Sequence, residues 1–191
     1  MPDAEFESFS DIELVEKAKT NPDFFTPLVR RWQERLFFYV RRISYFNTED
    51  AEDLVQETFL KVYRYLNDYD QSFAFSTWLY RIARNTVFDA IRARKARPHD
   101  VYLEETEAVS LFLSQTDISK KIVQKDSFAM IVSLIQALPY KYKEVMVLRY
   151  LEEKTYEEIM DIIQKPKGTV AALLNRARKQ IVSEARRLRV Y

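Results

Sequence analysis

The sequence predicts an all-α protein made of two small helical domains. Its 191 residues include one glycine and six prolines, too few to supply the turns of a sheet protein. Apolar residues instead recur at spacings of three and four, as in helices that bury one face. This periodicity lapses in an acidic central stretch. We therefore expect helical domains at residues 1–96 and 126–191, joined by a linker at 97–125.

Four helices are expected in the first domain, each with an apolar stripe on one side. Asp11 and Ser76 are expected to cap the first and the last of them. The third gives the strongest signal, because its apolar stripe is continuous from Ala51 to Leu66. The expected helices span residues 11–19, 27–45, 48–66 and 76–94, with a polar loop at 67–75 before the last.

The second domain is expected to end in a helix-turn-helix, after helices that begin near Ser127 and at Pro139. Residues 155–181 read TYEEIMDIIQKPKGTVAALLNRARKQI. Thr155 and Glu158 have the spacing of a capping box, and Pro166 suits the first turn of a second helix. A helix-turn-helix places its second helix in the major groove of DNA, although a plain helical hairpin has a similar pattern.

The second helix of this motif has an apolar inner face and a polar outer face. Val170, Leu174, Ala177 and Ile181 face inward, and Ala172, Asn175, Arg176 and Lys179 fall on the opposite side. Gly168, the one glycine of the protein, lies near the start of this helix. It would let a phosphate approach the exposed backbone N–H groups closely.

The net charge of +1 hides a segregation of charge along the chain. Residues 81–97 contain six basic and one acidic side chain, and residues 167–189 contain seven and one. Residues 99–126, between them, contain three basic and six acidic side chains. Charge runs are often only solvated faces. Two basic blocks on helices with apolar opposite faces favour two surfaces for a polyanion.

Composition also excludes several classes of function. The chain has no cysteine, which excludes disulfides and thiolate metal sites and favours a cytoplasmic location. No apolar run approaches the length that spans a membrane, so no membrane insertion is expected. The single histidine, His99, lies in the linker, and no nucleophile–base or metal spacing appears. We expect neither an enzyme nor a cofactor.

Two helix surfaces of the first domain are candidates for binding. Asp53, Gln56 and Glu57 project together from the third helix, although an acidic face is usually just solvated. The fourth helix presents a basic stripe that also carries an amide and an aromatic ring: Arg81, Arg84, Asn85, Phe88 and Arg92.

Aromatic residues are dense just before this stripe, at Tyr69, Phe73, Phe75 and Trp78. Arginines neutralise phosphates and aromatic rings stack on unpaired bases, which is how single-stranded nucleic acid is held. Core packing is the alternative for each ring. It is the favoured one for Trp78, and the choice is open for Phe73 and Phe75.

Three segments in order resemble bacterial RNA polymerase sigma factors of the extracytoplasmic-function (ECF) group. They are DAEDLVQETFLKVYR at residues 50–64, FSTWLYRIARNTVFDAIRARK at 75–95, and ALPYKYKEVMVLRYLEEKTYEEIMDII with GTVAALLNRARK within 137–179. Single motifs such as YEEI are weak signals. Their order and spacing over nearly the whole chain are specific.

The resemblance implies roles for the three surfaces. The third helix would bind the β′ clamp of core RNA polymerase through Asp50, Asp53, Leu54, Gln56 and Glu57. The fourth helix and its loop would melt and read the −10 promoter region through Phe73, Phe75, Trp78, Arg81, Arg84, Asn85, Phe88 and Arg92. The last domain would read the −35 region through Lys167, Gly168, Thr169, Ala171, Ala172, Asn175, Arg176 and Lys179.

The resemblance also implies partners. They are core RNA polymerase, through its β′ clamp and β flap, promoter DNA that is duplex at −35 and single-stranded at −10, and an anti-sigma factor. Such a factor could hold the protein at the membrane. The acidic linker would run through the active-site and RNA-exit region of the polymerase.

The helix-turn-helix departs from the family pattern. A basic residue, a serine and an arginine usually follow GTV, where this chain has Ala171, Ala172 and Leu173. Gln164 and Lys165 stand where a glycine and an apolar residue are common. Because two cations are missing, we expect a weaker or altered −35 preference.

Two alternatives remain open. One is a helix-turn-helix transcriptional regulator with an unrelated helical sensor domain, which leaves the first two surfaces without linked roles. The other is a sigma-like decoy that only binds partners, which the altered recognition helix keeps possible. Binding to core polymerase separates the regulator from a sigma factor.

Overall fold

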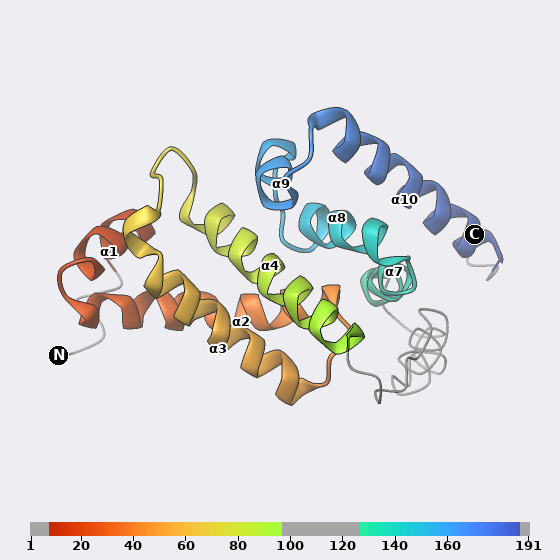
Figure 1. Cartoon of the computed structure of the whole chain (residues 1–191). Helices are drawn as coiled ribbons and strands as arrows, with labels where there is room; N and C mark the ends of the chain where they lie inside the picture. Colours follow the sequence, from red (N-terminus) through yellow and green to blue (C-terminus); the bar gives the residue numbers. More distant parts are fainter. Residues whose placement is uncertain (1–7, 97–126, 188–191) are drawn as a thin grey trace. The chain divides into compact units, whose positions relative to one another are not determined.

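The computed structural model describes residues 8–96 and 127–187, and all regular elements within them are helical (Figure 1). The first set comprises α1 (Asp11–Ala18), α2 (Phe25–Ile43), α3 (Thr48–Arg64) and α4 (Phe75–Lys95), with short 3-10 turns at Pro22–Phe24 and Leu66–Asp68. The second set comprises α7 (Ser127–Gln136), α8 (Tyr140–Tyr150), α9 (Tyr156–Ile163) and α10 (Lys167–Arg187). The predicted all-α class is confirmed.

The described residues form two compact units. One contains α1, α2, α3 and nearly all of α4, and the other contains α7, α8, α10 and most of α9. The predicted linker at 97–125, with His99, lies outside the described residues. The expected helix boundaries agree with the structure to within two residues in the first unit.

The start of α1 corrects one prediction. Ser10, not Asp11, caps the helix: the Ser10 hydroxyl accepts a hydrogen bond from the Glu13 amide, and the Glu13 carboxylate accepts one from the Ser10 amide. This is a complete capping box. Asp11 is one residue too late to cap, and its carboxylate instead contacts α2.

The start of α4 corrects a second prediction. The helix begins at Phe75, so Ser76 lies inside the first turn and does not cap it. The carbonyl of Ala74 accepts the first helical hydrogen bonds, from the amides of Thr77 and Trp78. Phe75 is buried (2 % exposed). Its burial against the rings of Trp32, Tyr69 and Trp78 anchors this helix start.

Aromatic rings fill the core of the first unit. Tyr39 of α2 lies 4.7 Å from Tyr80 of α4, and Trp32 lies 6.3 Å from Tyr80 and 6.5 Å from Phe75, measured between ring centroids. Pairs at these distances, tilted or edge-to-face, add to the free energy of burying the rings. They fix α4 against α2 and so fix which face of α4 points outward.

The second unit packs α10 against α8 and α7. The predicted capping box at the start of α9 is present, with the Thr155 hydroxyl accepting from the Glu158 amide at 3.1 Å. Gln164 ends α9 in the left-handed conformation, with φ of 53°. Glycine is preferred there, because a side chain is strained at positive φ. The turn of the helix-turn-helix therefore forms without its usual glycine.

Among residues 8–96 and 127–187, no helix is both long and apolar enough to cross a membrane. The same residues contain no cluster of three or more His, Asp or Glu side chains arranged to hold a metal ion.

Candidate nucleic-acid interfaces

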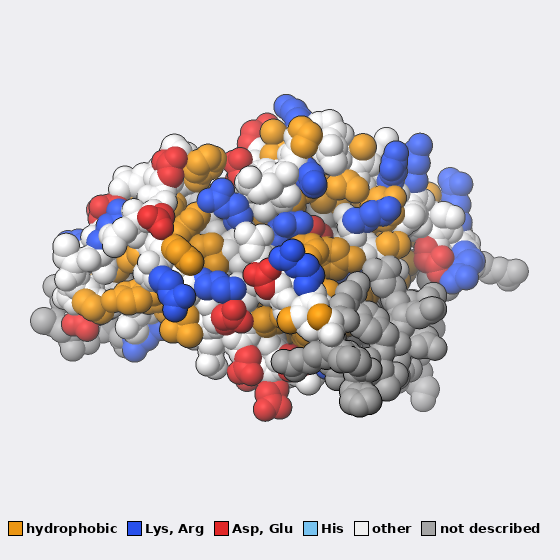
Figure 2. Space-filling view, in the orientation of Figure 1, with side chains coloured by type: hydrophobic (Ala, Val, Ile, Leu, Met, Phe, Trp, Pro, Cys, Tyr) orange, Lys and Arg blue, Asp and Glu red, His pale blue; other side chains and the backbone are white. Residues whose placement is uncertain are grey.

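The predicted basic stripe of α4 forms a hollow on the surface of the first unit. A hollow of ≈ 480 Å³ is lined by Arg84, Asn85, Phe88, Asp89 and Arg92. Four of the five are residues that the sequence singled out for binding DNA. Figure 2 shows Lys and Arg side chains interspersed with hydrophobic ones over α4.

Side chains within this stripe hold one another in place. The Arg84 guanidinium lies 4.3 Å from the centroid of the Phe88 ring, a cation–π distance. Arg92 is 76 % exposed in its side chain and pairs with Asp89 one turn earlier. Such an exposed pair contributes little to stability. Arg92 can therefore leave Asp89 and pair with a phosphate at little cost in free energy.

The three aromatic candidates near the stripe differ in exposure. Phe75 and Trp78 are 2 % and 6 % exposed, so the structure places both rings in the core. Phe73 is partly exposed. Of the three, only Phe73 can therefore meet a base without disrupting the core. Arg81 is also partly exposed, on the same helix.

Phe73 lies in a tight turn, residues 69–74, that hydrogen bonds define. The Phe73 amide donates to the carbonyl of Asp70 at 3.2 Å, and the Asp70 carboxylate accepts from the Ser72 amide at 2.9 Å. That second bond lowers the pKa of Asp70. The Tyr69 hydroxyl donates to the carbonyl of Phe73 at 2.6 Å. The turn therefore presents Phe73 in a fixed conformation.

The outer face of α3 presents most of the residues predicted to bind the polymerase. Asn47 caps this helix by accepting from the Asp50 amide at 2.7 Å. Asp53, Gln56 and Glu57 are exposed and Asp50 is half-buried. Leu54, which was predicted to join them, is 6 % exposed and packs in the core beneath.

Sequence reasoning missed Leu60, which lies on the same face of α3. Its side chain is 70 % exposed, although neighbouring Phe59 is buried. Leu60 comes three residues after Glu57, and residues three or four apart share a helix face. An apolar side chain among polar ones at that spacing could have identified it. Leu60 therefore adds an exposed apolar side chain to the predicted binding face.

The early turns of α10 present a surface of a different kind. Of the residues predicted to face inward, Val170, Leu174 and Ala177 are buried, and Ile181 is half-buried. All eight residues predicted to read DNA are exposed: Lys167, Gly168, Thr169, Ala171, Ala172, Asn175, Arg176 and Lys179. A Cβ added at Gly168 would meet nothing within 4 Å, so the glycine leaves open space beside the helix start.

Later in α10, basic residues border a second hollow. Arg178, Lys179, Val182, Ser183 and Arg186 line ≈ 420 Å³. The Arg178 guanidinium donates to the Tyr150 hydroxyl at 2.8 Å, and this hydrogen bond raises the pKa of Arg178. Val182, which is half exposed, and Arg186 were not predicted to belong to this surface.

Comparison with known proteins identifies both units. Residues 28–97 match the model of Sigma-70 region 2, and residues 128–181 match that of Sigma-70, region 4. The chain is 33 % identical to the ECF RNA polymerase sigma-E factor of Haemophilus influenzae, over 92 % of this chain and 95 % of that protein.

Two solved structures share the fold. CnrH, solved with the cytosolic domain of CnrY, superposes with a TM-score of 0.65 at 24 % identity, covering 91 % of this chain and 95 % of CnrH. The sigma factor RpoE of Bartonella quintana, solved with the anti-sigma factor NepR, superposes with a TM-score of 0.60 at 18 % identity. The match covers 82 % of this chain and 93 % of RpoE. The chain therefore belongs to the ECF group of RNA polymerase sigma factors, the regulatory subunits that direct promoter-specific transcription initiation.

Proposed function

We propose that this sigma factor binds core RNA polymerase through α3 and reads its promoters at two places, one on α4 and one on α10. The two domains would be residues 1–96 and 126–191, joined by the linker at 97–125. The observation that carries the proposal is the hollow on α4. It joins cations, an amide and a ring in one concave surface.

The chemistry of this hollow suits the opened −10 strand. Arginines at its rim neutralise phosphates, and Phe88 and the partly exposed Phe73 offer rings for unpaired bases. Stacking on an aromatic ring contributes about 1–3 kcal/mol per base, which offsets the cost of unstacking the duplex. The chain supplies no catalytic group in this scheme; the chemistry belongs to the polymerase.

The surface on α10 suits the duplex −35 region. The exposed N-terminal turn of this helix has free space beside Gly168 and can approach a phosphate closely. Asn175, Arg176 and Lys179 lie along the exposed face behind it. Ala171 and Ala172 can contact thymine methyl groups but offer no charge.

The α3 face would contact the β′ clamp, with Asp53, Gln56 and Glu57 on the helix turns before the exposed Leu60. Apolar and polar side chains occur together in protein interfaces in this way. The second domain would contact the β flap. The protein would work in the cytoplasm. An anti-sigma factor would keep it inactive, either in the cytoplasm or at the membrane. NepR in the Bartonella quintana complex supports this last expectation.

Charge reversal on α3 tests the polymerase-binding face. Asp53→Arg with Glu57→Arg should lower the affinity for core RNA polymerase by at least about tenfold. The two new arginines would repel the cations that the carboxylates are proposed to meet on the polymerase. Affinity is measured by fluorescence anisotropy with labelled chain. Asp23→Arg with Glu34→Arg is the matched control, since both residues are exposed elsewhere in the unit. Equal affinity of the two double variants would contradict the proposal.

A further inference from the structure

The turn at residues 69–74 is held by a helix that lies outside the matched family region. The match to Sigma-70 region 2 begins at residue 28, whereas α1 spans Asp11–Ala18. Side chains of α1 nevertheless reach both α2 and the turn. The contacts form a continuous path from α2 through α1 to Phe73.

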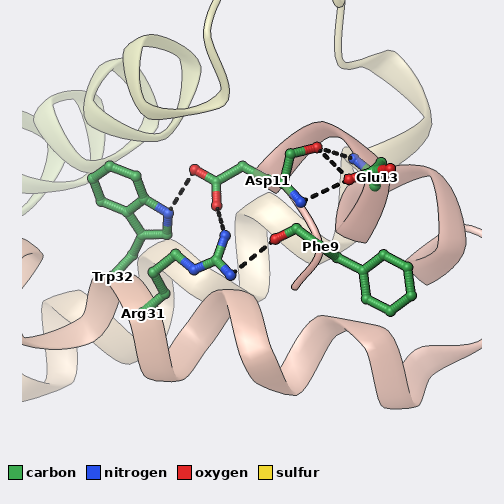
Figure 3. Close-up of polar contacts among 6 residues, drawn as sticks. Phe9, Asp11, Glu13, Arg31 and Trp32 are labelled. Atoms are coloured by element: carbon green, nitrogen blue, oxygen red, sulfur yellow. Dashed lines mark hydrogen bonds and ion pairs between the residues drawn. The ribbon is translucent and has the colours of Figure 1, made fainter. Parts of the chain in front are cut away.

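The path begins at Asp11, which fastens α1 to α2 (Figure 3). One carboxylate oxygen of Asp11 accepts from the Arg31 guanidinium at 2.6 Å, and the other accepts from the Trp32 indole N–H at 3.1 Å. Arg31 also donates to the carbonyl of Phe9 at 3.0 Å. Three hydrogen bonds therefore fix the beginning of α1 on a helix of the core.

Glu16 carries the path from α1 to the turn. Its carboxylate accepts from the Gln71 side-chain amide at 2.6 Å, across 55 residues of sequence. The same carboxylate pairs with Lys19 on its own helix. The hydrogen bond from Lys19, with that from Gln71, lowers the pKa of Glu16, so Glu16 is an ionised acceptor at neutral pH.

Tyr69 holds the other side of the turn. Its ring lies 5.9 Å from Phe75 and 5.1 Å from Trp78, so it is packed against the buried start of α4. Its hydroxyl donates to the carbonyl of Phe73. Burial raises the pKa of Tyr69, and the charges of Asp11, Asp70 and Glu16 raise it further. The hydroxyl therefore remains a donor throughout the neutral range.

We propose that Glu16 and Tyr69 are positioning residues for promoter reading: they fix the 69–74 turn so that Phe73 meets an extruded base of the −10 strand. Neither residue contacts DNA in this scheme. Glu16 restrains the turn through Gln71, and Tyr69 restrains it through the Phe73 carbonyl. The inference rests on the proposed role of this surface, because a braced turn improves recognition only where a base is read.

The test compares five variants in holoenzyme assembled with core RNA polymerase. Glu16→Ala and Tyr69→Phe each remove one restraint, Phe73→Ala removes the reading ring, Glu16→Gln keeps a carbonyl acceptor for Gln71, and Glu34→Ala is an exposed control on α2. The probe is a library of forked DNA whose −10 positions are randomised. Bound molecules are sequenced to give the preference at each position.

We expect Glu16→Ala and Tyr69→Phe to weaken the preference at one or two positions by about three- to tenfold, the effect of one lost hydrogen bond. Phe73→Ala should weaken it at the same positions. Glu16→Gln and Glu34→Ala should have the sequence preference of the wild type. Every variant should bind core RNA polymerase as the wild type does. Unchanged preference in both Glu16→Ala and Tyr69→Phe would overturn the proposal.

Amide hydrogen exchange of the full chain without polymerase provides a second readout. The amides of Ser72 and Phe73 should exchange about tenfold faster in Glu16→Ala than in Glu34→Ala, because opening of the turn becomes easier. Equal exchange would show that Glu16 does not brace the turn, and would overturn its role. If the turn is braced but the wild-type holoenzyme selects no −10 sequence, the proposed function itself fails, and the positioning role fails with it.

Discussion

The surfaces on α4 and α10 are both basic and helical, yet they are built differently. On α4 the cations border a hollow, one of them lies over an aromatic ring, and a hydrogen-bonded turn carries Phe73 nearby. The early turns of α10 expose Gly168, Ala171 and Ala172. The cations of α10 lie mainly in its later turns.

The α4 surface therefore consists of side chains held in place, whereas the start of α10 exposes its backbone. Groups that are already held in place lose little conformational entropy when they bind. The α4 surface has such groups, whereas the start of α10 offers mainly backbone N–H groups and methyl groups. We therefore expect promoter choice to depend more on α4 than on α10.

The largest expected effect comes from removing cations on α4. Arg84→Ala with Arg92→Ala should weaken binding of holoenzyme to single-stranded −10 DNA by about 100-fold, because phosphate contacts and a stacked guanidinium are lost together. Arg176→Ala with Lys179→Ala on α10 should weaken binding of a full promoter by about tenfold. Filter binding at fixed salt measures both. Equal losses, or a larger loss from α10, would show that promoter binding does not depend more on α4.

The next effect concerns the stability of the α4 unit. Asp11→Ala removes the acceptor of Arg31 and of the Trp32 indole, so it should lower the free energy of unfolding of this unit by about 1–3 kcal/mol. The α10 unit should keep its stability. Denaturant titration followed by residue-resolved NMR distinguishes the units, with Asp23→Ala as the control. A loss shared equally by both units would contradict the assignment.

A gain of function tests the sparse surface of α10. Ala171 is exposed and Leu173 partly exposed, so Ala171→Lys with Leu173→Arg can be accommodated without filling the core. These cations should raise the affinity for upstream promoter DNA by about three- to tenfold, the range of one good contact. Gel-shift titration of duplex DNA provides the measurement. No gain would mean that the missing cations do not weaken this surface.

As pH falls, the free energy of unfolding of the α4 unit should decrease at a slightly higher pH than that of the α10 unit. Hydrogen bonds lower the pKa values of Glu13 and Glu16, through Ser10 and Lys19 respectively, and the Ser72 amide lowers that of Asp70. For Glu158 of the α10 unit, burial acts to raise the pKa. Hydrogen bonds from Thr155 and the charge of Lys154 outweigh it, and the net shift is downward.

The sign follows from the direction of these shifts. A carboxylate with a lowered pKa in the folded state stabilises the fold above its unfolded pKa, and this stability is lost as pH falls through the folded value. The loss therefore begins below the ordinary values of 3.8 for Asp and 4.5 for Glu. Thermal melts between pH 6 and about pH 3 should show this loss of stability. High salt should reduce the loss, because most of these groups are exposed. A melting temperature that does not change with pH would contradict the expectation.

Local patterns predicted the fold well and the surfaces partly. The capping box at Thr155 and the inner face of α10 depend on residues within one or two helical turns, so the sequence contains the whole signal. The exposed set on α10 follows from the same periodicity.

Tertiary contacts explain what the sequence could not predict. For Phe75 the sequence left the choice between core and surface open, and contact with the rings of Tyr69 and Trp78 decides its burial. Asp11 could cap α1 by its chemistry, but Ser10 does so and Asp11 pairs with Arg31, 20 residues away.

Run-off transcription on fragmented genomic DNA of the source bacterium tests whether this protein directs promoter-specific initiation. Core RNA polymerase with this protein should produce new discrete transcript starts that share a −10 sequence. Those starts should disappear with Asp53→Arg and Glu57→Arg, and with Arg84→Ala and Arg92→Ala. A protein that binds core polymerase but yields no new starts would contradict the account.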